Sequence, residues 1–279
     1  PESSSFIPAG LLHSMPIRMP HSPMFMLDPT TDSRTIGILG GMGPAATVDF
    51  YDKLVRSTPG ARDQEHLRVI LWSDPTVPDR IRALEGTGPD PTPWLEQGVA
   101  HLLACGAEIL VVPCNTIHIY LSQVVRNKDI EFISIIDAAV DAAVDAQVDD
   151  SIGLLATDAT LASCLYQRAL EARGLEAILP SSEMQSLLKN IIGQVKAGNT
   201  GQQVRDDVRT ILKRLGGTVT GAIAACTEIS VILAHIDSDI RIIDPSLALA
   251  RKAVERAQAP LPLDVRGHHL HASNGEENR

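Results

Sequence analysis

Two cysteines, Cys114 and Cys226, occupy matching positions in the two halves of this 279-residue chain. Each follows a short apolar run typical of a strand, and each precedes polar residues suited to the start of a helix. At such a position the free backbone N–H groups and the helix dipole favour the thiolate over the thiol. One cysteine of this kind is a candidate nucleophile. Two in equivalent positions predict two opposed acid–base groups acting on one substrate.

Such a pair could remove a proton from one face of a carbon atom and return a proton to the other face. One group must be deprotonated while its partner is protonated, and the roles exchange in the reverse direction. Cysteine fits because its reference pKa of ~8.5 is close to working pH, so modest tuning populates either form. Asn115 and Thr116 follow the first cysteine. Thr227 and Glu228 follow the second, so that both segments offer polar groups and backbone N–H donors to a substrate carboxylate.

The segments that position these cysteines alternate between strand-like and helix-like patterns. We expect strands at 35–39, 67–72, 108–112 and 151–157, and helices at 44–57, 92–105 and 116–126. Such alternation predicts an α/β fold with mainly parallel sheets.

The pattern also repeats along the chain. The strand-like segments at Ile36 and Ile152 are 116 positions apart, and the two cysteine segments are 112 apart. Nearly equal offsets predict two pseudo-symmetric αβα lobes of roughly a hundred residues, a plausible domain size. We expect an N-terminal lobe at 34–132, completed by a C-terminal helix at 244–258, and a C-terminal lobe at 133–243. The active site would then lie in the cleft between them, where the strand ends of open α/β sheets place ligands.

The two ends of the chain have a different composition. Residues 1–33 are rich in Pro, Ser and Met without a sustained period, which predicts a disordered leader that does not exclude organellar targeting. Residues 261–279 are polar and predict a loose tail.

Composition limits the partners. A net charge of −10 with only 3% aromatic residues argues against binding to nucleic acid. No apolar run approaches the ~20 residues that cross a bilayer, so no membrane contact is expected. The acidic balance also requires locally placed cations in any site that binds an anionic substrate.

The four cysteines fit neither a disulfide framework nor a CxxC zinc site. Reduced thiols in a cytoplasmic compartment are therefore expected. Cys105 and Cys164 lie inside helical patterns, which predicts that they are small buried hydrophobic residues.

Several short segments carry a more specific signal. They are Gly40-Gly41-Met42-Gly43-Pro44, Pro78-Asp79-Arg80, Pro113-Cys114-Asn115-Thr116-Ile117-His118, Val195-Lys196-Ala197-Gly198-Asn199, Cys226-Thr227-Glu228 and Ile243-Asp244-Pro245. In this order, over residues 34–258, they resemble the aspartate/glutamate racemase superfamily. Glutamate racemases of cell-wall synthesis typically carry Cys-Thr-His at the second cysteine. Cys226-Thr227-Glu228 and His118 instead resemble the aspartate racemase branch.

The resemblance implies an amino-acid racemase that interconverts L- and D-aspartate, with glutamate as an additional candidate, and that works as a homodimer without pyridoxal phosphate or a metal. It implies that Cys114 and Cys226 are the acid–base pair. Arg80 and Lys196 match cations that hold the carboxylates of a dicarboxylic amino acid, although surface ion pairs are the ordinary role of both residue types. The resemblance further implies pocket-lining positions at Met42, Asn115, Thr116 and Thr227.

Other polar residues allow two interpretations each. Thr157 and Thr160 could donate hydrogen bonds to the substrate or cap the helix that follows them. Glu228 could orient a partner group or the substrate ammonium, or complement the helix dipole. His118 could tune the pKa of Cys114, but a hydrogen-bonded core histidine is the favoured interpretation.

Three other function classes compete with this hypothesis. The segment 41–46 is a loose G-x-G-x-x-A motif after a strand, which would predict a dinucleotide-binding dehydrogenase but explains neither cysteine. Maleate isomerases, hydantoin racemases and arylmalonate decarboxylases are related enzymes that use one or two cysteines at these places. A catalytically silent homologue that binds an amino acid would be free to lose one cysteine.

Overall fold

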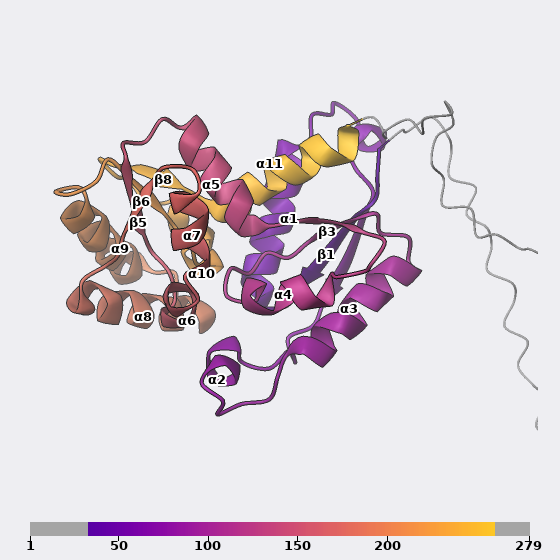
Figure 1. The fold of residues 1–279 in the computed structure, drawn as a ribbon. Helices are drawn as coiled ribbons and strands as arrows, with labels where there is room; N and C mark the ends of the chain where they lie inside the picture. The colour runs from indigo at the N-terminus through magenta and orange to yellow at the C-terminus, as the bar shows by residue number, and fades with distance from the viewer. Residues whose placement is uncertain (1–32, 260–279) are drawn as a thin grey trace, which may run out of the picture. The chain divides into compact units, whose positions relative to one another are not determined.

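The computed structural model describes residues 33–259, which contain two four-stranded parallel sheets with helices around them (Figure 1). The first sheet has the order β2-β1-β3-β4, with β1 (Ile36–Gly40), β2 (Val69–Ser73), β3 (Ile109–Val111) and β4 (Glu131–Ile133). The second has the order β6-β5-β7-β8, with β5 (Ser151–Leu154), β6 (Glu176–Ile178), β7 (Gly221–Ile223) and β8 (Arg241–Ile243). The predicted α/β class is therefore confirmed. The leader at 1–33, apart from Ser33, and the tail at 261–279 lie outside the described residues.

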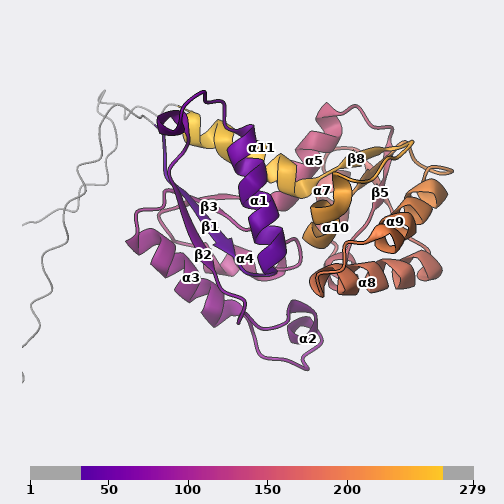
Figure 2. The same ribbon diagram turned by 180° about the vertical axis from the view of Figure 1, so that it is seen from behind.

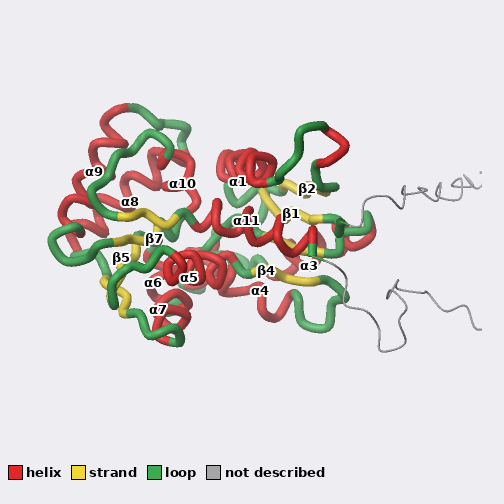
Figure 3. Tube along the Cα trace, turned by 90° about the horizontal axis from the view of Figure 1, so that it is seen from above, coloured by secondary structure: helices red, strands yellow, loops and turns green. Residues whose placement is uncertain are grey.

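The helices lie between and around these strands, and in the view of Figure 3 helices lie on either side of the strands of each sheet. From α1 to α5 they are α1 (Pro44–Ser57), α2 (Arg80–Leu84), α3 (Thr92–Ala104), α4 (His118–Val124) and α5 (Ile135–Asp145), with a short 3-10 helix at Asp63–Glu65. The rest are α6 (Asp158–Ala162), α7 (Leu165–Glu171), α8 (Ser182–Lys196), α9 (Gln202–Leu215), α10 (Thr227–Leu233) and α11 (Pro245–Gln258).

The two sheets repeat one topology. In each, the first strand of the set lies between the second and the third, and every pairing is parallel. Parallel strands that are buried on both faces need helices on both faces, and all five residues of β1 are buried. The third strand of each set, β3 or β7, leads into one of the two cysteines, so the repeat detected in the sequence is a repeat of structure.

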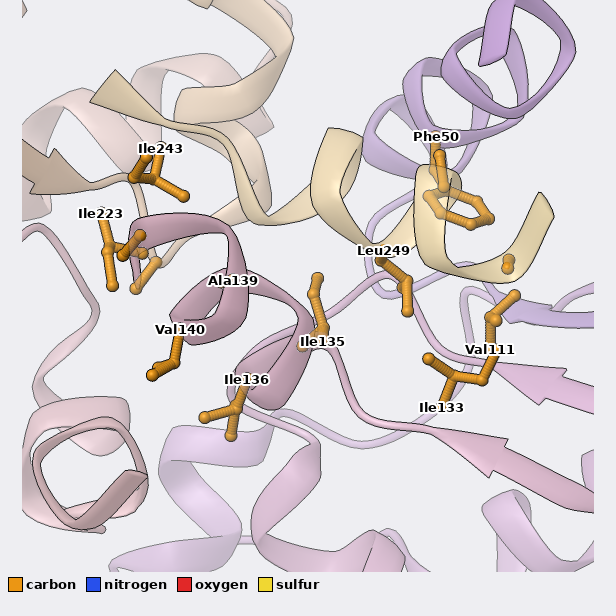
Figure 4. Packing of buried hydrophobic residues seen from close by; sticks show 14 of the residues in the cluster. Phe50, Val111, Ile133, Ile135, Ile136, Ala139, Val140, Ile223, Ile243 and Leu249 are labelled. Carbon is orange, nitrogen blue, oxygen red and sulfur yellow. The ribbon is translucent and has the colours of Figure 1, made fainter. Parts of the chain in front are cut away.

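Helices α5 and α11 carry the hydrophobic core from one sheet to the other (Figure 4). The core cluster joins Val111 and Ile133 of the first sheet to Ile223 and Ile243 of the second. Leu249 of α11 is fully buried in the same cluster. Burying a side chain of this size contributes on the order of 2 kcal/mol.

The last helix lies against the first one. Helix α11 follows the final strand of the second sheet, yet it packs along α1 and α5 (Figures 1 and 2). Phe50 and Leu54 of α1 and Val254 of α11 are buried in one cluster. Asp244 begins α11 by accepting hydrogen bonds from the backbone N–H groups of Ser246 and Leu247.

Two cysteines differ from the prediction. Cys105 and Cys164 are exposed rather than buried. Cys105 follows the last residue of α3 and precedes Gly106, whose φ of 89° turns the chain away from the helix. Cys164 separates α6 from α7 in the left-handed conformation, with φ 55°. The helical pattern of the sequence continues through both sites, but the helices end there, so neither side chain enters the core.

Lys53 connects α1 to Asp244, the residue that caps α11, and to helix α10. Its ammonium group lies 2.6 Å from Asp49 and 2.8 Å from Asp244, and it donates to the carbonyl of Ser230 in α10. The Ser230 hydroxyl donates to Asp244 at 2.7 Å. Burial raises the pKa of Asp49 even though its hydrogen bond to Lys53 lowers it. One cation therefore balances two poorly solvated carboxylates.

We expect Lys53→Met to lower the free energy of unfolding by about 2 kcal/mol, less than for a fully buried pair because the three side chains keep some exposure. The loss should shrink as the pH falls, because Asp49, whose pKa burial already raises, is neutralised by protonation when its cation is absent. Urea unfolding at several pH values measures both effects. Lys252→Met, which removes an exposed pair with Glu255, is the control and should change stability by less than about 1 kcal/mol. Equal losses in the two variants would contradict the balancing role of Lys53.

No helix within residues 33–259 combines the length and the apolar character that a membrane crossing requires.

Candidate active site

Each of the two central cysteines sits in the same kind of turn after a strand. Cys114 follows β3 and donates its backbone N–H to Val112 at 2.8 Å, and Cys226 follows β7 and donates to Ala224 at 2.7 Å. Both are buried, with 5% of Cys114 and 4% of Cys226 exposed. The backbone N–H of Ile117 lowers the pKa of the first thiol, and the backbone N–H of Glu228 lowers the pKa of the second. The matching settings predicted for the two cysteines are therefore present.

The helix starts differ between the two turns. Cys226 directly precedes α10, as predicted. After Cys114 the residues 115–117 form tight turns, and α4 begins only at His118 rather than at 116. The backbone N–H of His118 bonds to the carbonyl of Asn115, three residues earlier. The first thiol therefore lies beside this turn rather than directly beside the N-terminus of a helix.

Charged groups act unequally on the two thiols. Burial raises the pKa of Cys114, whereas Arg80 and, more weakly, Lys196 lower it. Burial raises the pKa of Cys226 well above its ordinary value, and the Glu228 carboxylate raises it further. The thiol Sγ of Cys226 donates to Oε2 of Glu228 at 3.0 Å. The pKa of both thiols is therefore raised, that of Cys226 more strongly, and the expectation that these turns favour the thiolate is wrong because burial outweighs the local N–H groups.

The same two groups influence both cysteines. Glu228 raises and Lys196 lowers the pKa of Cys114 and also that of Cys226. Since Coulomb interactions fall with distance, the two thiols and these two charges occupy one electrostatic neighbourhood. The two cysteines, 112 positions apart in the sequence, therefore respond to the same two charges.

Three threonine hydroxyls form a cluster beside this pair. Thr116, which follows Cys114, lies 3.0 Å from both Thr157 and Thr160, and these two are also 3.0 Å apart. The Thr157 hydroxyl accepts from the backbone N–H of Thr160 and caps α6. The capping interpretation of Thr157 is therefore confirmed, and its hydroxyl also contacts the first cysteine's segment. All three residues are buried.

Arg80 and Lys196 end up in different surroundings. Arg80 is the first residue of α2, which Asp79 caps, and its guanidinium donates to the carbonyl of Met42 at 3.2 Å. Lys196 is the exposed last residue of α8. Within residues 33–259 neither side chain forms a salt bridge, although both cations lower the pKa of Asp79.

Met42 and Thr227 are both buried at the starts of helices. Met42 precedes α1 and contributes its backbone carbonyl to Arg80. Thr227 is the first residue of α10, directly after Cys226. The neighbouring Gly41 has φ 92°, and a Cβ there would lie 2.4 Å from backbone atoms of Asp74. This glycine therefore serves a close turn against the loop after β2.

His118 has a structural role. It is buried, and its Nδ1 lies 2.8 Å from the carbonyl oxygen of Cys114. Its Nε2 accepts the backbone N–H of Ile135 at 3.2 Å, which places the proton on Nδ1. Burial lowers the pKa of His118 to about 4, so the ring is neutral at physiological pH. The prediction of a hydrogen-bonded core histidine is confirmed.

Tyr166 contacts the site, although the sequence alone does not predict this role. It lies in α7, and its hydroxyl donates to Oδ1 of Asn115 at 2.6 Å. No local pattern links two residues 51 positions apart, and a single tyrosine on the buried face of an amphipathic helix is the ordinary signature of a core residue. Asn115 is only 2% exposed, and its Nδ2 has no hydrogen-bond partner among the described residues.

A cavity of about 920 Å³ lies beside α4, α5 and α7 and includes neither cysteine. Its lining mixes acidic residues such as Asp141 with basic ones such as Arg173, which already pair with each other. The chemistry of the side chains, rather than cavity size, marks the candidate active site.

Comparison with known proteins decides the family. A family model described as Asp/Glu/hydantoin racemase matches residues 39–253. The chain belongs to this family. As a racemase it is an isomerase, and the resemblance noted in its sequence is confirmed.

Relatives of this racemase agree in fold and length. Picrophilus torridus aspartate racemase is 30% identical and has a TM-score of 0.73, over 80% of this chain and 94% of that one. An aspartate racemase homologue from Pyrococcus horikoshii is 27% identical with a TM-score of 0.66, over 81% and 100%. The broad-specificity amino-acid racemase RacX of Bacillus subtilis is 26% identical over 223 residues, 78% of this chain and 96% of that protein.

Family membership also removes the dinucleotide alternative. The racemase model covers the whole segment 41–46 that resembles a nucleotide-binding motif. The glycines of the segment 41–46 lie in the turn between β1 and α1.

Proposed function

We propose that this racemase interconverts L- and D-aspartate, and glutamate as a second substrate, through proton transfer by Cys114 and Cys226 without pyridoxal phosphate. The observation that carries the proposal is the pair of buried thiols, one after each sheet's third strand, which share the charges of Glu228 and Lys196. A two-base reaction needs two acid–base groups near one carbon, and this arrangement supplies them.

The unequal pKa values suggest which thiol ionises first. The pKa of both thiols is raised, but Arg80 partly offsets the rise at Cys114, so Cys114 would lose its proton first while Cys226, bonded to Glu228, would stay a thiol. In one direction Cys114 takes the Cα proton, and the electron pair left on Cα delocalises into the substrate α-carboxylate. The thiol of Cys226 then gives its proton to the opposite face. The thiolate left on Cys226 begins the reverse reaction.

Cations and hydroxyls around the thiols suit a dicarboxylic amino acid. Arg80 could bind one carboxylate in a bidentate manner, and Lys196 could act as a point charge on the other. The cluster formed by Thr116, Thr157 and Thr160 offers further donors. Aspartate racemases among the relatives support aspartate as the first substrate to test, and RacX supports a breadth beyond it. Remaining pocket positions would be Met42, Asn115 and Thr227, with Glu228 at the substrate ammonium or at Cys226.

The decisive experiment is incubation with L-aspartate in D2O without pyridoxal phosphate, followed by chiral analysis and counting of α-deuterium. D-aspartate that carries one α-deuterium is the expected product. The same assay with glutamate sets the breadth, and maleate and a hydantoin test the related reactions. Absence of both D-amino acid and α-exchange with aspartate and glutamate would refute the proposal.

Replacing Arg80 tests its role in binding. We expect Arg80→Ala to lower kcat/KM for aspartate about 10- to 100-fold, because a charge-assisted hydrogen bond to a carboxylate is lost. The pKa of Cys114 should rise at the same time, because Arg80 lowers it. Arg82→Ala is the matched control, since Arg82 is exposed on the same helix and its guanidinium bonds to the carbonyl of Thr87. Equal effects of the two substitutions would rule out a binding role for Arg80.

We further propose that the protein is a cytoplasmic homodimer. Each chain would have an N-terminal lobe at 34–132, completed by the helix at 244–258, and a C-terminal lobe at 133–243. The repeated sheet topology and the packing of α11 on α1 support the division into lobes. Sedimentation of the purified chain tests the dimer.

A further inference from the structure

The bond between Tyr166 and Asn115 joins the two sheets at the first cysteine. Tyr166 belongs to α7, beside the second sheet, whereas Asn115 follows Cys114 directly. The tyrosine is fully buried in the shared hydrophobic core, so its ring has a fixed position. Burial raises the pKa of Tyr166 well above its ordinary value. Its hydroxyl therefore remains protonated and donates to the amide oxygen at every working pH.

The hydrogen bond from the Tyr166 hydroxyl to Oδ1 fixes one orientation of the Asn115 amide. The two ends of an asparagine side chain are nearly equal in shape but opposite in hydrogen bonding. A hydroxyl that donates to Oδ1 directs the NH2 group to the other side. There Nδ2 is buried without a partner among the described residues. A buried donor in this state is unfavourable in the free protein, which indicates that it is paired when a ligand is bound.

We propose that Tyr166 is a positioning residue that holds the Asn115 amide with its NH2 group toward the substrate carboxylate beside Cys114. The inference rests on the proposed two-cysteine reaction. As the Cα proton moves to Cys114, negative charge develops on that carboxylate, and a fixed N–H donor stabilises it most at that moment. Tyr166 makes the donor ready before the substrate binds.

The test uses Tyr166→Phe, Asn115→Ala and the double variant, with Tyr51→Phe as the matched control on an exposed tyrosine of α1. Racemisation is measured at a temperature where thermal unfolding shows every variant folded. We expect Tyr166→Phe to lower kcat about tenfold or more with a smaller change in KM, because the donor acts chiefly in the transition state. In the Asn115→Ala background the same substitution should have no further effect.

A further variant separates the donor from the shape of the side chain. Asn115→Asp keeps an acceptor for the Tyr166 hydroxyl but replaces the NH2 group with an oxygen, so kcat should fall although the tyrosine bond remains. Unchanged kcat in Tyr166→Phe, or an equal loss with and without Asn115, would overturn the proposal.

A second readout does not depend on turnover. With 15N-labelled asparagine, the two Nδ2 protons of Asn115 should give separate, slowly exchanging NMR signals that shift on addition of aspartate. Tyr166→Phe should shift these signals and speed their exchange with solvent, and Tyr51→Phe should do neither. If the wild-type protein racemises neither aspartate nor glutamate, the proposed function fails, and the amide signals alone then decide the role of Tyr166: unchanged signals in Tyr166→Phe refute it.

Discussion

Replacing either Cys114 or Cys226 by alanine is expected to reduce racemisation of aspartate by about 10²- to 10⁴-fold, the usual contribution of a positioned acid–base group. Each variant keeps one thiol, which can remove and return a proton on its own face only. We therefore expect each variant to exchange the α-proton for deuterium slowly and without inversion. The enantiomer that undergoes this exchange should differ between the two variants. The measurement is 1H NMR of each enantiomer in D2O, with chiral analysis of the product.

The exposed cysteines provide matched controls for this pair. Cys105→Ala and Cys164→Ala remove the same sulfur atom from the surface and should leave the rate unchanged. Full activity in Cys114→Ala or Cys226→Ala would rule out the two-base reaction. Exchange of one and the same enantiomer in both variants would show that the thiols do not face each other across the substrate.

Glu228→Gln is expected to shift the alkaline limb of the pH–rate profile to lower pH. The carboxylate accepts the Cys226 thiol at 3.0 Å and raises its pKa, so removal of the negative charge makes the thiol more acidic. The active enzyme holds one proton between the two thiols. Loss of that proton ends activity at high pH, and in the variant this loss occurs at lower pH.

Thermodynamics supplies an internal check on this result. Aspartate enantiomers have equal free energies, so kcat/KM must be equal in the two directions at every pH. The limb must therefore move equally for L- and D-aspartate. Absorbance of the thiolate near 240 nm gives the same pKa without turnover, and Glu255→Gln on the exposed face of α11 is the control. A limb that stays in place, or a thiol pKa that rises, would contradict the role of Glu228.

Local signals in the sequence predict the elements well where a cap and a period agree. Helix α1 runs from Pro44 to Ser57 as expected, because proline at the first helical position is compatible with the missing N–H and the apolar period continues to Leu54. The strands β1, β3 and β5 are present but shorter or shifted by one to three residues. Cys164 was misplaced because a left-handed residue between two short helices leaves no signal in hydrophobic periodicity.

In the candidate site, too, residues marked by a local pattern are predictable and contacts that depend on tertiary packing are not. Cys114 and Cys226 are detectable because their flanking segments repeat along the chain. The bonds of Tyr166 to Asn115 and of Lys53 to Asp244 are not, because each depends on tertiary packing between residues 51 and 191 positions apart. The difference in acidity between the two thiols likewise follows from which charges the fold places beside each of them.

The position of α11 has a consequence for synthesis on the ribosome. Phe50 and Leu54 of α1 are covered by a helix that ends at Gln258, so the first sheet and its helices cannot complete their packing while the chain between them is still being made. At a translation rate of about 5–20 residues per second, that interval lasts roughly 10–40 s. During this time the nascent chain exposes an apolar surface that a chaperone could bind. The packing around the first sheet and the packing around the second sheet are therefore completed at almost the same time.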